Sequence, residues 1–119
     1  MAIQNPSQVN ASGELISTTG DLATFMKGLV SGKLISQASL KEMTTASPQS
    51  PVYGLGVFTR QTPCGITYSH GGNLYGYATE MYTKADGSKQ VAVASAEGKM
   101  PYFTVAEKTS QLAIQEICK

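Results

Sequence analysis

Apolar residues in the first half of the chain recur at helical spacing. After a stretch without clear periodicity they occupy positions i, i+3, i+4, i+7 and i+8, at Leu22, Phe25, Met26, Leu29 and Val30. This spacing predicts one apolar stripe on a helix of about three turns. Thr18 and Asp21 have the spacing of a capping box at its start, and Gly32 is suited to end it. A second, shorter helix is expected to have its N-cap and buried side chains at Ser36, Leu40 and Met43.

The pattern changes to that of strands after residues 46–51, which contain two prolines and are expected to form a loop. Four strands are predicted, at residues 53–60, 66–70, 77–84 and 90–96. They are separated by turns at residues 62–65 and 85–87 and by a glycine-rich bend at residues 71–76. One face of the last strand is rich in alanine, which allows a helix to approach closely.

A packing helix is predicted at the end of the chain. Pro101 suits its start, and its inner stripe is expected to contain Tyr102, Val105, Ala106, Thr109, Leu112, Ala113 and Ile117. Together these elements indicate an α+β chain, with helices in residues 1–50 and an antiparallel sheet with its helix in residues 51–119. One helix covers only one face of a sheet, and the pattern predicts no cover for the other face within these residues.

Composition and charge exclude several classes of function. The net charge is +1 and charged residues make up 14% of the chain, with no run of Lys or Arg. Nucleic acid and anionic membrane surfaces are therefore not expected partners. His70 is the only histidine and there are two cysteines. A four-ligand zinc site is excluded, and we expect no metal and no cofactor. Taken alone, Cys64 and Cys118 are open to two interpretations, as buried thiols or as a disulfide.

The segment Ser69-His70-Gly71-Gly72-Asn73 is the best candidate for chemistry. It ends a predicted strand, and its glycines remove side chains where the backbone of a ligand would lie. His70 would serve there as acid, base or carboxylate partner near neutral pH. The alternative interpretation is a structural histidine at a strand end, because short glycine patterns are common. No Ser-x-x-Lys, Tyr-x-Asn or Gly-x-Ser-x-Gly occurs, and the eight acids are interpreted as surface charges.

Several short motifs, taken in order, resemble the serine beta-lactamase-like proteins. This family includes D-alanyl-D-alanine carboxypeptidases, class C beta-lactamases and related esterases. The segment from Ser12 to Leu22 is similar to its S-G-G-L-x-S-T-x-x-D-L, and Tyr53-Gly54-Leu55-Gly56 to its Y-G-L-G. His70-x-Gly72 matches its third motif, and Tyr75-Gly76-Tyr77 the segment that follows. The likeness to Streptomyces-type DD-carboxypeptidases extends to Cys64-Gly65-Ile66 and Cys118.

The resemblance implies a fragment. Residues 1–50 would end the all-α region and residues 51–119 would form most of the α/β region. The partner would be a missing N-terminal part with the nucleophile, and the parent would be exported to an extracytoplasmic or secreted location. It would act through an acyl-enzyme on an acyl-D-alanyl peptide, a beta-lactam or an ester. We expect no turnover by this chain alone, since covalent catalysis needs the nucleophile. Homo-oligomers are expected through open sheet surfaces.

The resemblance also implies roles for single residues. His70 would lie beside the substrate carboxylate, Gly72 would let the substrate backbone pair with the strand, and the N–H of Asn73 would donate to the oxyanion. Gly71 and Asn73 replace hydroxyl residues of the peptidases, and Phe58 stands at the place of an arginine. Arg60 faces the same side and is a candidate substitute. An esterase or amidase, or a non-catalytic binding or assembly module, are the alternatives.

A disulfide between Cys64 and Cys118 follows from the same resemblance. In that fold the last helix packs across the sheet, so that its end lies near the turn that contains Cys64. The bond would close a loop of about 55 residues and restrict the unfolded chain.

Overall fold

The computed structural model describes residues 10–13, 15–74, 77–96 and 102–119. A 3-10 turn, η2 (Asn10–Ser12), precedes helices α1 (Thr19–Val30) and α2 (Gln37–Thr44). Four strands and a last helix follow, namely β1 (Phe58–Thr62), β2 (Gly65–Leu74), β3 (Tyr77–Lys84), β4 (Gln90–Ala96) and α3 (Tyr102–Cys118). The strands form one antiparallel sheet in the order β1-β2-β3-β4, which confirms the predicted α+β class.

Helix α1 begins and ends as its sequence predicts. The Thr18 side chain accepts a hydrogen bond from the backbone N–H of Asp21, and its hydroxyl donates to the Asp21 carboxylate at 2.8 Å. Gly32 follows the helix with φ of 73°, a conformation that favours glycine. Ser36 caps α2 in the same way as Thr18 caps α1.

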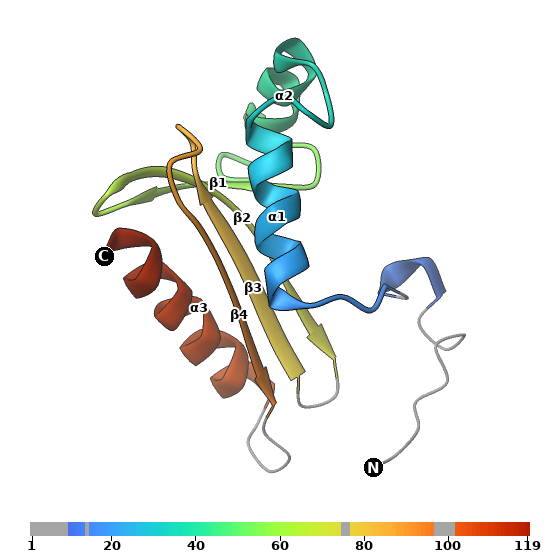
Figure 1. The fold of residues 1–119 in the computed structure, drawn as a ribbon, viewed down its shortest axis with the longest axis vertical. Coiled ribbons are helices and arrows are strands. Elements are labelled where there is room, and N and C mark those ends of the chain that lie inside the picture. The colour runs from blue at the N-terminus through green and yellow to red at the C-terminus, as the bar shows by residue number, and fades with distance from the viewer. Residues whose placement is uncertain (1–9, 14, 75–76, 97–101) are drawn as a thin grey trace.

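Both faces of the sheet carry a helix, which corrects the prediction that one face would lack cover. Met81 packs in the cluster of Met26 and Leu29 from α1, whereas the neighbouring Tyr82 packs against Ala113 and Ile117 from α3. Successive strand residues point to opposite faces, so α1 and α3 lie on opposite sides of β3 and β4. Figure 1 shows the two helices on either side of the sheet.

Two apolar residues predicted for buried stripes are exposed. Phe25 is 47% exposed and Leu112 is 44% exposed, although Met26 and Ala113 beside them are buried. Each lies one position away from the row that contacts the sheet, about 100° around the helix. The contact row is therefore narrower than the apolar stripe in the sequence.

The first strand begins later than predicted. Tyr53 to Gly56 precede β1 and bend at Leu55 and Gly56, and an isolated bridge joins Tyr53 to Phe58. Gly56 has φ of 83°, and a Cβ on Gly54 would lie 2.1 Å from the carbonyl oxygen of Met43. These glycines let the chain turn tightly against the end of α2 rather than continue as a strand.

The glycine-rich segment is also different from the prediction. Strand β2 continues through Gly71 and Gly72 to Leu74, paired with β3 along its length. Neither glycine has a positive φ, so extended backbone is maintained through both. Tyr75, Gly76 and Pro101 lie outside the described residues.

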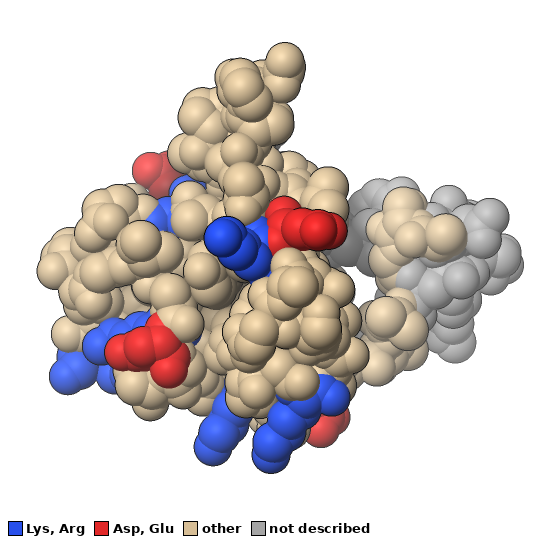
Figure 2. All heavy atoms as spheres, turned by 90° about the horizontal axis from the view of Figure 1, so that it is seen from above, with Lys and Arg blue, Asp and Glu red and all other residues tan. Residues whose placement is uncertain are grey.

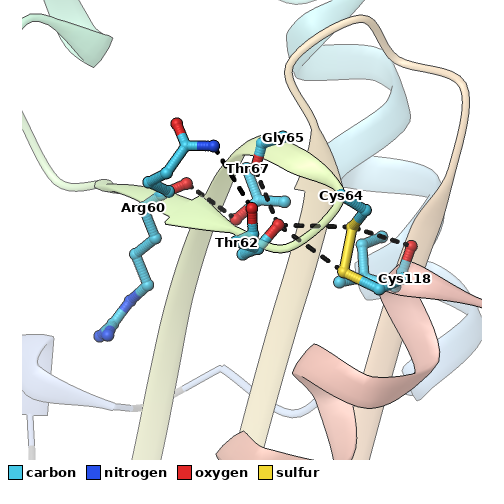
Figure 3. Close-up of a disulfide and its surroundings, with 8 residues drawn as sticks. Arg60, Thr62, Cys64, Gly65, Thr67 and Cys118 are labelled. Atoms are coloured by element: carbon cyan, nitrogen blue, oxygen red, sulfur yellow. Dashed lines mark hydrogen bonds between the residues drawn. A yellow bond between two sulfur atoms is a disulfide. The ribbon is translucent and has the colours of Figure 1, made fainter.

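Cys64 and Cys118 form a disulfide, as predicted. Their Cα atoms are 5.3 Å apart, and the bond joins the β1–β2 turn to the last residue of α3. Figure 3 shows Thr62 beside it, with its hydroxyl donating to the Gly65 carbonyl at 2.7 Å. The disulfide therefore anchors α3 to the hairpin from which β2 extends.

No helix among the described residues is long and apolar enough to span a membrane.

Candidate functional site

Strand β2 extends beyond the end of its neighbour β1. The pairing of β1 with β2 stops at Phe58 opposite Ser69, whereas β2 pairs with β3 as far as Leu74. Over residues 70–74 the side of β2 away from β3 has no partner strand among the described residues. This free edge is long enough to bond an extended chain.

The two glycines on this stretch have different surroundings. A Cβ on Gly72 would meet nothing within 4 Å, so the space beside it is open. A Cβ on Gly71 would lie 2.5 Å from Oε1 of Glu80, the residue directly opposite on β3. The Glu80 carboxylate therefore occupies the space that any side chain at position 71 would need.

Both ring nitrogens of His70 have partners within the chain. Nδ1 lies 2.7 Å from the Gly71 carbonyl oxygen and Nε2 lies 3.2 Å from the Tyr53 hydroxyl. A carbonyl oxygen only accepts, so Nδ1 carries the proton. In the neutral imidazole Nε2 is then an acceptor for the Tyr53 O–H. His70 is held as a hydrogen-bond acceptor, and a substrate or a second hydroxyl would have to displace Tyr53.

Aromatic rings surround this histidine. The ring centroids of Tyr53 and Phe58 are 4.4 Å apart, and those of Phe58 and His70 are 5.9 Å apart. The Arg60 guanidinium carbon lies 4.7 Å from the Phe58 centroid, in a cation–π arrangement. Arg60 is exposed and Phe58 is half-buried. The structure thus brings Phe58, Arg60 and His70 together and adds Tyr53.

Glu80 is the carboxylate of this region. Burial raises its pKa, whereas the positive charge of Arg60 and the nearby His70 lower it. No ion pair within 4.0 Å joins it to Arg60 among the described residues. The sequence interpretation of every acid as a surface charge is therefore wrong for Glu80. The sequence pattern did not predict where this carboxylate lies, because its place opposite Gly71 depends on how β2 and β3 pair.

Asn73 lies on the free stretch, exposed and opposite Ala78. On the face that Figure 2 shows, acidic and basic side chains are interspersed. No cluster of three or more potential metal ligands exists in the part of the chain that the structure describes.

Comparison with known proteins identifies the fold. No family model matches the chain. A D-stereospecific amidohydrolase from Streptomyces sp. is 34% identical with a TM-score of 0.69, over 88% of this chain and 33% of that one. SurE, in a structure with D-Leu, is 18% identical with a TM-score of 0.65, over 85% of this chain and 25% of that one. Both have the beta-lactamase-like fold, and this chain has the fold of their matching part.

The chain spans about a third of the length of the amidohydrolase and a quarter of that of SurE. A second SurE structure gives 20% identity and a TM-score of 0.58. The match therefore extends over only part of each of these proteins.

Proposed function

We propose that this chain is the C-terminal part of an exported serine hydrolase and supplies the strand along which the substrate lies. The observation that carries the proposal is the free edge of β2 over residues 70–74, with open space beside Gly72. An extended substrate would add to this edge as a short strand, with main-chain hydrogen bonds for affinity.

The roles on this edge are divided among three residues. Gly72 lets the substrate backbone approach closely, because no side chain stands there. The backbone N–H of Asn73 donates to the oxyanion that develops during acyl transfer. His70 accepts a hydrogen bond at Nε2, the nitrogen that the Tyr53 hydroxyl now contacts. The nucleophile and the second oxyanion donor would come from an N-terminal partner segment, since Ser-x-x-Lys is absent from this chain.

The substrate class we favour is an amide, peptide or ester of a D-amino acid. The amidohydrolase is described as D-stereospecific, and SurE was crystallised with D-Leu. Gly71 stands where the carboxypeptidase resemblance implies a hydroxyl residue, and Phe58 stands where it implies an arginine. These two replacements favour an amidase or esterase over a carboxypeptidase. The disulfide supports an exported parent, because such bonds persist in oxidising compartments.

Ligand binding followed by NMR tests this proposal with the chain itself. We expect acetyl-D-alanyl-D-alaninamide to shift the backbone amide signals of Gly71, Gly72 and Asn73 more than its L,L isomer does. Gly72→Ala should weaken this binding several-fold, since its methyl group has room in the fold but occupies the approach of the ligand. Gly20→Ala is the matched control, with its Cβ in ordinary contact at 3.7 Å. Equal shifts with both isomers, or shifts confined to other elements, would contradict the proposal.

A further inference from the structure

The Glu80 carboxylate lies over Gly71 of the proposed substrate strand. It lies opposite Gly71, and its Oε1 and Cδ atoms are 2.5 Å and 2.9 Å from the Cβ position of that glycine. Opposite residues of an antiparallel pair project to the same face, so the carboxylate covers the backbone of β2 at Gly71. A group of a bound substrate that reaches this side of Gly71 therefore meets a carboxylate first.

The neighbouring side chains of Arg60 and His70 make no ion pair or hydrogen bond with Glu80 in the described part of the chain. The Arg60 guanidinium lies over the Phe58 ring and forms no ion pair within 4.0 Å with Glu80 among the described residues. His70 uses its two ring nitrogens for Tyr53 and the Gly71 carbonyl. In the described part of the chain the Glu80 carboxylate has no hydrogen-bond donor, and it remains available to accept one from a ligand.

We propose that Glu80 is a specificity-determining residue that selects a carboxamide over a carboxylate in the substrate group that lies beside Gly71. The inference rests on the proposed function of β2. A primary amide N–H donates to the Glu80 oxygen, whereas a substrate carboxylate would face a like charge at short range, which is unfavourable. The preferred substrates would thus be amidated D-amino acid derivatives rather than peptides with a free C-terminus.

A matched pair of ligands tests this selectivity. Acetyl-D-alanyl-D-alaninamide and acetyl-D-alanyl-D-alanine differ only in the terminal group, and their dissociation constants are measured by NMR at pH 8, where carboxyl groups are ionised. We expect the wild type to bind the amide roughly tenfold more tightly than the acid. Glu80→Gln should remove most of this preference, chiefly by improving binding of the acid. Glu107→Gln, an exposed glutamate on α3, is the charge-matched control and should keep the preference.

The possible results separate this inference from the function on which it rests. Tighter binding of the acid by the wild type, or the same preference in Glu80→Gln and wild type, would overturn the role of Glu80 and leave the substrate strand supported. The absence of any shift at residues 71–73 with either ligand would overturn the proposed function and this inference together. Loss of the preference in Glu80→Gln alone supports both.

Discussion

The hydrogen bond between the Tyr53 hydroxyl and His70 is the clearest contact of a single residue that the sequence pattern did not predict. Tyr53 was expected on a strand, but the turn at Gly54 and Gly56 brings its hydroxyl to Nε2 of His70. His70 itself was found from its place in a histidine–glycine segment. Its hydrogen bonds were not predictable, because they depend on a residue 17 positions earlier and on how the intervening chain turns.

Tyr53→Phe tests the tautomer that this contact fixes. In the neutral ring of the wild type we expect the proton on Nδ1 and none on Nε2. Without the phenol, Nε2 loses its donor, so the variant should populate the tautomer protonated at Nε2. Long-range nitrogen–proton NMR reports this directly, because His70 is the only histidine. Tyr77→Phe, at an exposed tyrosine, is the control. An unchanged tautomer in Tyr53→Phe would show that Tyr53 does not set the ring.

A double-mutant cycle tests how Glu80 and Gly71 share space. Gly71→Ser should destabilise the chain by about 1–3 kcal/mol, because the new side chain displaces the Glu80 carboxylate. Glu80→Ala should relieve most of that cost, giving a coupling of roughly 1 kcal/mol or more. Urea unfolding of the four proteins measures it. Additive effects would mean that Glu80 lies elsewhere in solution.

At the scale of elements, prediction succeeded where local signals agreed. Strands β3 and β4 have the predicted bounds, since apolar alternation and a turn ending in Gly87 (φ of 72°) agree there. The start of β1 was predicted too early, because the sequence pattern of residues 53–56 is typical of a strand although the chain bends there. Strand β2 was predicted too short, because glycine is a weak signal that fits both bends and extended backbone. In the structure residues 71–74 continue as a strand because they pair with β3.

Gly54→Ala tests the contact that holds this turn on α2. The added methyl group would lie 2.1 Å from the Met43 carbonyl oxygen, a backbone atom that cannot move alone. We expect a loss of about 2–4 kcal/mol in the free energy of unfolding. Gly72→Ala is the matched control, because its Cβ meets nothing within 4 Å, and it should change stability by less than about 1 kcal/mol. Similar urea midpoints for both variants would contradict this packing.

At the scale of the whole molecule, the covered sheet changes the grounds for self-association. Helix α1 packs on the face that was expected to be exposed, so that face no longer favours oligomers. The outer edge of β4 still has no partner strand among the described residues. Ala94 and Ala96 are exposed there, and β4 has no charged side chain that would oppose pairing with a strand of another chain. Self-association through this edge remains our prediction.

The disulfide links global stability to the candidate site. It closes a loop between residues 54 positions apart, and in the chain-entropy model such a loop stabilises the folded state by about 4 kcal/mol. That is a large share of the roughly 5–15 kcal/mol typical of a domain. We expect reductant to lower the urea midpoint strongly, and Cys64→Ser with Cys118→Ser to have the same low midpoint with or without reductant. Amide exchange at Gly71 and Gly72 should quicken together with that of α3, because the bond joins that helix to the hairpin that extends into β2. A midpoint insensitive to reductant in the wild type would show that packing of α3 alone holds this hairpin in place.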